Sequence, residues 1–242
     1  MGMKDSIIDY ILVPAGLMIM VAYHGWLIRQ VRNHPTRTII GINAINRRFW
    51  IHAMMEDVSK SGILAVQTMR NNIMASTVLA STAITLSSVI AVLMTNSGGY
   101  RPSKLSFGDK SSLILNVKFF CILSCFLMAF MLNMQSIRFY SHAGLLINVP
   151  FKTGRGLDRQ STIEYVARTV SRGSLFWSLG LRAFYFSIPM FMWIFGPIPM
   201  FVTCVLLVSM LYFLDVSNEF GDVTVAPVPL INVHRDEEAN SN

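Results

Sequence analysis

The chain has 242 residues, of which 53% are hydrophobic and 14% are charged, and its net charge is +7. Soluble domains carry about 25% charged residues, and the shortage here lies in long apolar runs, which indicates an integral membrane protein and excludes an ordinary soluble domain. The positive charge is unevenly spread between those runs, so it indicates membrane orientation and does not favour nucleic-acid binding.

Four apolar runs are long enough to cross about 30 Å of hydrocarbon at about 1.5 Å per residue. The first run has no basic leader and no small-residue cleavage site, so we expect a signal anchor that stays in the protein. We predict an all-α polytopic membrane protein with a single domain over residues 1–220 and an extended, disordered tail over 221–242. Its four transmembrane helices are expected at residues 7–28, 73–94, 113–137 and 184–214.

The lysines and arginines indicate how the chain is threaded. The two long loops, residues 29–70 and 138–182, each carry seven basic and two acidic residues, whereas the C-terminal tail is acidic. Basic loops stay in the cytosol, so we expect both long loops inside and both termini outside, in the plasma membrane or another membrane of the secretory pathway. The N-terminal "MGMKDS" opposes this orientation, because myristoylation of Gly2 would require a cytosolic N-terminus.

Both long loops show helical patterns. Apolar residues recur at helical spacing from Ile42 to Met69, and Ser161 and Glu164 have the spacing of a capping box. We therefore predict amphipathic cytoplasmic helices, of which the first either lies at the lipid headgroups or packs on the cytoplasmic ends of the spans. The charge of both loops either meets anionic lipid or reflects ordinary positive-inside topology. The residues expected to face lipid are Arg47, Arg48, Trp50, Arg70, Arg138 and Arg182.

The second predicted span has one face of small and hydroxyl-bearing residues. Small residues allow helix backbones to approach closely in lipid, so this face predicts a tight seam between helices. The alternative is a hydroxyl-lined path for water or ions. The hydroxyl-bearing members of the face are Ser76, Thr77, Ser81, Ser87 and Ser88.

Lys118 lies inside the third apolar run, where a charge costs at least about 2.5 kcal/mol. Three arrangements avoid that cost: the side chain extends outward to water, it pairs with a carboxylate at similar depth, or it faces an aqueous cavity that attracts anions. Under the predicted topology the carboxylates available for pairing are Asp9 and Asp215.

The fourth run is unusually long and is interrupted by "FGPIP" at residues 195–199. Proline removes a backbone donor and kinks a helix. We expect one kinked, tilted span, because the first half of the alternative, a broken hairpin, is too short to cross.

Two segments, "QTMRNNIMASTVLASTAI" and "FMLNMQSIRFYSHAGLLINVP", resemble the membrane family catalogued as domain of unknown function 599, in its plant-type branch. The resemblance extends over about residues 7–220 and implies a four-span membrane protein without an assigned activity. It also includes "RAFYF" and "FGP", and its main positions are Arg70, Asn71, Ala80, Ser81, Thr82, Arg138, Phe139, Tyr140 and Gly144.

The sequence contains no G-x-S-x-G, H-E-x-x-H or Walker motif, and its histidines and cysteines lack metal-site spacing, so we expect neither an enzyme, a cofactor nor a bound metal. Two functions remain. One is an oligomeric pore or transport component that favours anions, which would require a homo-oligomer because four spans enclose little space. The other is a membrane scaffold that does not transport and binds lipid or a partner through the basic cytoplasmic helices.

Overall fold

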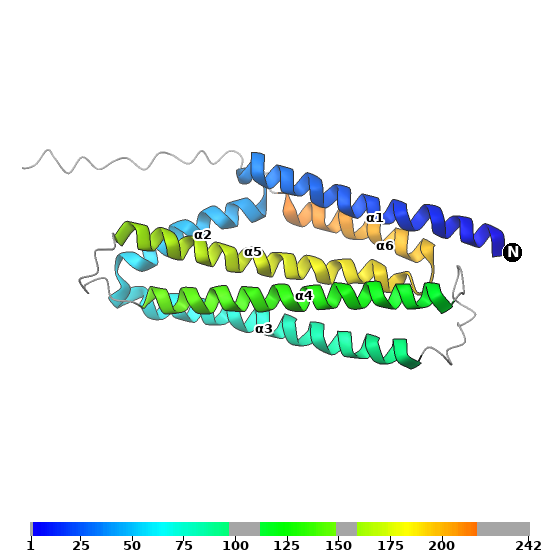
Figure 1. Ribbon diagram of the computed structural model, residues 1–242. Coiled ribbons are helices and arrows are strands. Elements are labelled where there is room, and N and C mark those ends of the chain that lie inside the picture. The colour runs from blue at the N-terminus through cyan, green and yellow to red at the C-terminus, as the bar shows by residue number, and fades with distance from the viewer. Residues whose placement is uncertain (1, 97–111, 149–158, 217–242) are drawn as a thin grey trace, which may run out of the picture.

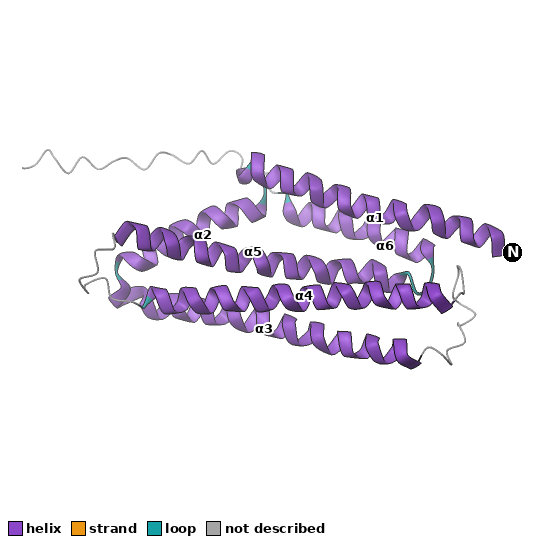
Figure 2. Cartoon of the chain, in the orientation of Figure 1, coloured by secondary structure: helices purple, strands orange, loops and turns teal. Residues whose placement is uncertain are grey.

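The computed structural model describes residues 2–96, 112–148 and 159–216, and within these ranges the chain is helical apart from short connections (Figure 2). The predicted C-terminal tail over 221–242 lies outside the described residues. The elements are α1 (Gly2–Asn33), the short 3-10 helix η1 (Pro35–Arg37), α2 (Ile39–Glu56), α3 (Val58–Asn96), α4 (Ser112–Ile147), α5 (Arg159–Met192) and α6 (Pro197–Asp215).

The prediction of an all-α membrane protein is confirmed, but the prediction of four spans is wrong. Five of the described helices are long and apolar enough to cross a membrane. The candidate spans are 9–33, 58–95, 113–147, 159–192 and 197–215. The second long loop is therefore largely a span, α5, whereas the first contains the predicted separate helix, α2.

The error arose in the fourth apolar run, which is not a single kinked helix. The chain reverses at Gly196, whose φ of 148° is a conformation that favours glycine, and Pro197 then begins α6. The first arm of the resulting hairpin is not short, because α5 begins at Arg159 and continues through Gly173 without a break. The predicted span began only at Phe184, after the arginines of the second loop. In the structure the helix includes Arg182, whose charge is paired with the carboxylate of Asp215.

The helices form layers around α4 and α5, which pack along their lengths (Figure 1). α3 packs on α4 at one side, and α1 and α6 run side by side in parallel at the other. The start of α1 lies at one end of the bundle, and the end of α6 lies part of the way along it toward the end where α2 lies (Figure 1). The expectation of both termini outside rested on four crossings, and the sidedness of the two ends stays a prediction.

The bundle contains two hydrophobic cores, which follow one another along its length. The first joins α1 and α6 to parts of α4 and α5, around Met20, Ile122 and Met200. The second joins α2 to other parts of α3, α4 and α5, around Ile51 and Val166. We call the part of the bundle level with α6 the membrane half, and the part built around α2 the projecting half.

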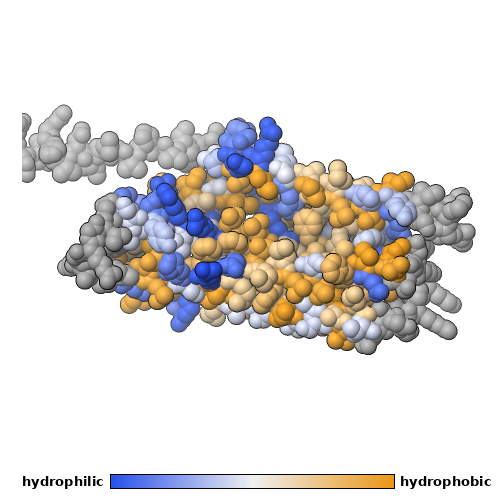
Figure 3. Space-filling view, in the orientation of Figure 1, coloured by the Kyte–Doolittle hydropathy of each residue, from blue (hydrophilic) through white to orange (hydrophobic). Residues whose placement is uncertain are grey.

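Helix lengths explain this division. The 19 residues of α6 measure about 28 Å, close to the hydrocarbon thickness of about 30 Å, whereas the 34 to 39 residues of α3, α4 and α5 measure about 51–58 Å. The three longer helices therefore extend beyond the bilayer at the end where α2 lies. Hydrophilic surface gathers at that end of the molecule, and hydrophobic surface predominates toward the other (Figure 3).

Candidate functional site

Lys118 lies near the start of α4, at the end of the membrane half away from α2, and only 3% of it is exposed. Its Nζ lies 5.3 Å from the centre of the Trp193 ring, at the end of α5. This distance is typical of a cation–π contact, which lowers the cost of burying the charge. Asp9 belongs to the same end of the bundle, where it and Trp193 line one cavity.

Asp215 is not the partner that sequence reasoning proposed for Lys118, because it lies at the opposite end of the membrane half (Figure 1). Its two carboxylate oxygens each accept a hydrogen bond of 2.8 Å from Nη2 of Arg182. The hydroxyl of Tyr23 donates to Oδ2 at 2.6 Å. The carboxylate thus joins α1, α5 and α6, and the loss of hydration is offset by three short polar contacts.

His24 completes this cluster and is held in one tautomer. Its Nδ1 lies 2.8 Å from the carbonyl oxygen of Met20, which can only accept, so Nδ1 carries the proton. Nε2 is then free to accept from Nη1 of Arg182, at 3.4 Å. Arg182 therefore binds the carboxylate on one nitrogen and the imidazole on another, which fixes its position between the helices.

The small-residue face of α3 divides into a buried seam and an exposed side. Ser76, Ala80, Ala83, Ser87 and Ile90 are buried at spacings of three and four residues, as expected for a helix packed on a neighbour. Thr77, Ser81 and Ser88 are exposed, and the hydroxyls of Thr77 and Ser88 donate to carbonyl oxygens one turn earlier in α3.

The buried part of this seam is closed by hydrogen bonds between helices. The hydroxyl of Ser136 on α4 lies 3.1 Å from that of Ser76 and donates to the carbonyl oxygen of Gly173 on α5 at 2.9 Å. A Cβ at Gly180 would lie 2.5 Å from Nδ2 of Asn133, so α4 and α5 approach as closely as a glycine allows. This geometry agrees with the tight seam, not with the alternative of a hydroxyl-lined path.

The basic residues expected to face lipid divide into two groups. Arg70 and Arg138 are exposed on α3 and α4, whereas Trp50 packs against the second core and Arg182 is turned inward to Asp215. Arg48 is exposed and forms a salt bridge of 3.0 Å with Glu164 of α5, and Arg168 approaches the same carboxylate at 3.2 Å. The expectation that all six face lipid is thus incorrect for Trp50 and Arg182, because each has partners inside the protein.

Arg47 has the most unusual environment of the basic residues. It lines a cavity of about 400 Å³ between α2 and α5, and its Nε is buried without a hydrogen-bond partner among the described residues. Loss of hydration lowers the pKa of Arg47, which nearby Tyr140 partly counteracts. The serine hydroxyls that line the cavity come from successive turns of α5, at Ser171, Ser174 and Ser178.

The chemistry of this cavity favours an anion. None of the described residues that line it is acidic, and Arg48 lines it as well as Arg47. A second cavity of about 280 Å³ shares Arg48 and Ser171 and adds Arg168 and Arg172, together with the carboxylate of Glu164 that pairs with Arg48 and Arg168. Guanidinium groups with several hydroxyls form the usual donor set for phosphate. We call these two adjoining cavities the arginine groove.

The arginine groove lies just outside the membrane half. Arg182 reaches Asp215, the last residue of α6, and Ser178 is one turn of α5 further toward the projecting half. Ser171 lies about 10 Å beyond Ser178 along the helix. Headgroup layers add about 5–8 Å on each side of the hydrocarbon, so the end of the groove at Ser178 is at the depth of the headgroups and its far end at Ser171 lies beyond them.

Sequence reasoning missed Tyr23 and His24, which had no pattern to distinguish them, and the partnership of Arg182 with Asp215. A signal for the partnership was present, because one arginine and one aspartate lie in two neighbouring apolar stretches, and a buried pair satisfies both. Among the described residues, no group of three His, Cys, Asp or Glu side chains is placed to hold a metal ion.

Comparison with known proteins gives one match. The family described as "Protein of unknown function, DUF599" matches residues 11–220 of the chain. No curated protein and no solved structure matches the chain.

Proposed function

We propose that this chain, which belongs to the DUF599 family of proteins of unknown function, is a membrane scaffold that binds the phosphate of an anionic lipid in the arginine groove. The observation that supports the proposal most directly is Arg47, whose Nε is buried without a partner in a cavity lined by three serines. A phosphate oxygen would accept from this donor and from the hydroxyls. The position of the Ser178 end of the groove at headgroup depth favours a lipid over a free anion.

The seam between α3 and α4 is the reason to prefer a scaffold to an anion pore. A pore would need the serine face of α3 and Lys118 to meet at a common aqueous axis. The buried serine Ser76 instead contacts Ser136, and Lys118 lies over Trp193. Liposome anion-flux measurements distinguish the two functions: we expect no flux above that of empty vesicles, and flux that Lys118→Met abolishes would establish the pore.

The sidedness follows from the basic groove in the same proposal. The arginine groove, the projecting half and the end of α6 face the cytosol, and the start of α1 lies across the membrane. Tyr165, 53% exposed on the projecting half, provides a test. In a cysteine-free background, Tyr165→Cys should react with an impermeant maleimide only after the cells are permeabilised. Reaction in intact cells would reverse the orientation.

Membership of the plant-type branch, residence in the plasma membrane or another secretory-pathway membrane, and a homo-oligomeric state are part of the same proposal. The branch is supported by "RNNIMAST" at the start of the membrane half of α3, and the membrane by the apolar first helix. Oligomerisation is supported by the exposed hydroxyls of α3, which offer a second small-residue face.

Lipid binding is tested by replacing Arg47 with glutamine. The purified protein is titrated with phosphatidic acid and with phosphatidylcholine of the same chains, and complexes are counted by native mass spectrometry. Loss of charge-assisted hydrogen bonds should weaken phosphatidic acid binding about 10- to 100-fold, with little effect on phosphatidylcholine.

The matched control is Arg70→Gln, which removes the same charge from an exposed position on α3. If the arginine groove is the binding site, this control should bind phosphatidic acid as tightly as the wild type does. Equal weakening in both variants would show general charge attraction and contradict a built site. Competition by inorganic phosphate alone, at the same concentration as the lipid, would identify a soluble anion as the ligand.

A further inference from the structure

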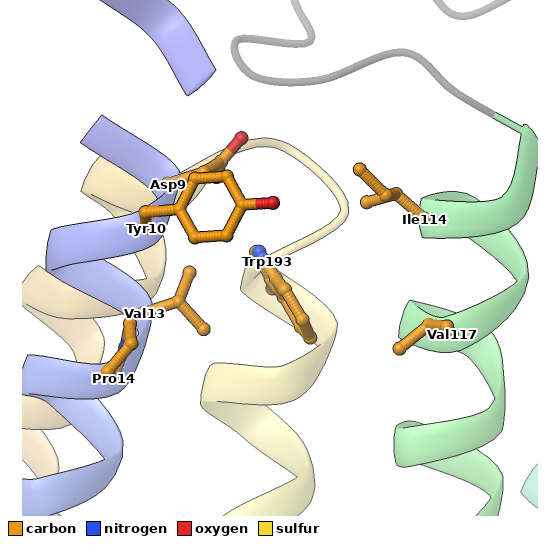
Figure 4. Close-up of a pocket in the computed structure, with 7 residues that line it drawn as sticks. All are labelled: Asp9, Tyr10, Val13, Pro14, Ile114, Val117 and Trp193. Atoms are coloured by element: carbon orange, nitrogen blue, oxygen red, sulfur yellow. The ribbon is translucent and has the colours of Figure 1, made fainter. Parts of the chain in front are cut away.

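Another cavity, separate from the two that form the arginine groove, lies at the other end of the membrane half. It measures about 250 Å³ and is lined by residues from α1, α4 and the end of α5 (Figure 4). Most of its wall is apolar, and the polar groups that reach it belong to Asp9, Tyr10 and Trp193. We call it the outer pocket.

The depth of the outer pocket is set by α1 and α6. Gly16 lies against Cys204, where a Cβ would be 3.2 Å from Sγ, and the two helices run in parallel. At this register Asp9 lies beside Pro197, where α6 begins. Because α6 is about as long as the hydrocarbon is thick, the pocket starts at the membrane–water boundary and extends about one turn inward, to Val13 and Pro14.

The pocket opens toward lipid at its side. Tyr10 is 81% exposed and Val117, across from it on α4, is 51% exposed. The residues on the deeper part of the wall are aliphatic or proline, as Figure 4 shows for Val13, Pro14 and Val117. An acyl chain or another apolar body that lies along the bundle can therefore enter without crossing a polar barrier.

The polar groups select the headgroup. Nε1 of Trp193 is buried, has no hydrogen-bond partner among the described residues, and points toward Asp9 and Tyr10 (Figure 4). An indole N–H only donates, and an ionised carboxylate only accepts. An ammonium cannot accept from the indole, and the ionised oxygens of a phosphate cannot donate to the carboxylate of Asp9. A hydroxyl both donates and accepts, so one alcohol oxygen suits both groups.

We propose that the outer pocket binds an uncharged lipid whose headgroup is a hydroxyl, of the diacylglycerol type, with its oxygen between Asp9 and Trp193 and its chains along Val13 and Val117. Lys118 is not among the described residues that line the pocket, and its ammonium over the indole holds the Trp193 ring in position. The site is separate from the arginine groove, and neither proposal depends on the other.

The test compares three photoreactive lipids that share their acyl chains and differ only in headgroup: diacylglycerol, phosphatidylcholine and phosphatidic acid, each with a diazirine on one chain. The full-length protein in nanodiscs is irradiated, and labelled peptides are mapped. We expect diacylglycerol to label segments 9–17 and 113–120, and the other two lipids to label them at least about fivefold less.

Two variants test the residues. Trp193→Phe keeps an aromatic ring for Lys118 and removes the N–H, so it should lower diacylglycerol labelling about fivefold, whereas Trp177→Phe, which removes another buried indole N–H, should not. Val117→Trp should fill the pocket and abolish labelling, whereas Leu127→Trp, exposed on the same helix, should not.

Equal labelling by all three lipids would overturn the headgroup assignment. Labelling outside the two segments, or labelling that neither Trp193→Phe nor Val117→Trp reduces, would overturn the site itself. Because Val117 is already exposed, its variant should fold even if the Trp193 variant does not.

Discussion

Two carboxylates show how differently the halves of the molecule handle charge. In the membrane half, the side chains of Asp215 and Arg182 are only 10% and 13% exposed, and Tyr23 and His24 fix their geometry. In the projecting half, Glu164 is 24% exposed, and its partners Arg48 and Arg168 are 63% and 71% exposed. Both carboxylates bind arginines at about the same distance, so water, not geometry, distinguishes them.

The comparison shows that similar contacts serve different purposes. Asp215 and Arg182 must stay together, because either one left alone would be a buried charge between three helices. Glu164 can lose a partner and be hydrated at once, so it leaves Arg48 and Arg168 available to the arginine groove. The pairs of the projecting half are therefore suited to exchange with a ligand, and the pair of the membrane half is suited to hold helices.

The largest effect is expected from Arg182→Met, which leaves the buried carboxylate of Asp215 without its cation. We expect the free energy of unfolding to fall by about 3–5 kcal/mol, measured by denaturation with SDS in mixed micelles. The double variant Arg182→Met/Asp215→Leu should recover most of the loss. A loss below about 1 kcal/mol in the single variant would mean that this pair behaves like a surface pair.

Packing should differ between two glycine positions of the bundle as well. Gly180→Ala places a Cβ against Asn133 and should cost about 1–3 kcal/mol of unfolding free energy, because α4 and α5 must separate. Gly144→Ala in the projecting half meets only Cβ of Met69 at 3.9 Å, and should be neutral or slightly stabilising in the same assay. Equal losses would remove the contrast between a tight and a looser seam.

A smaller effect is expected from Ser136→Ala, which removes the hydroxyl between Ser76 and Gly173. Hydrogen bonds between membrane helices contribute about 0.6 kcal/mol on average, and we expect a loss of that order. Ser124→Ala is the control, since its exposed hydroxyl binds only its own helix, at the carbonyl of Phe120. Matching losses in the two variants would show that the bond between helices contributes nothing of its own.

The smallest effect is expected from Glu164→Gln. Exposed ion pairs contribute about 0–1 kcal/mol each and are screened by salt, so the loss in unfolding free energy should be below about 1 kcal/mol and should vanish in 1 M salt. If the loss persists in high salt, the pairs of the projecting half are as protected from water as those around Asp215, and the comparison fails.

Much of the fold could be predicted from hydropathy alone. The first three predicted spans lie within α1, α3 and α4, and the helix expected in the first loop is α2. The predicted spans were shorter than the helices because their ends were placed at charged residues such as Arg70 and Arg138. These residues lie on the exposed faces of helices that continue past them. A charge in a sequence does not show whether its helix ends there or leaves the bilayer and continues.

The remaining features depend on contacts between distant residues. Most of α5 was assigned to a cytoplasmic helix in the second long basic loop, and only the position of Asp215 shows how the charge of Arg182 is balanced within the bundle. The arginine groove likewise needs α2 to lie against α5, which brings Arg47 to Ser171 and Ser174. The local sequence pattern shows neither the pairing of Arg182 with Asp215 nor the packing of α2 on α5. The seam between α3 and α4, in contrast, could be predicted from the spacing of small residues in α3.

The shortness of α6 has a consequence for how the chain fits a bilayer. α3, α4 and α5 are longer than any ordinary bilayer is thick, so each can span it fully. The 19 residues of α6 span only the thinner bilayers. Mismatch costs fractions of a kcal/mol per ångström, and α6 alone would experience it in thick, sterol-rich bilayers of about 32–33 Å. Bilayers of about 27 Å would fit α6 without thinning, so we expect the mismatch cost of the whole chain to be set by this one short helix.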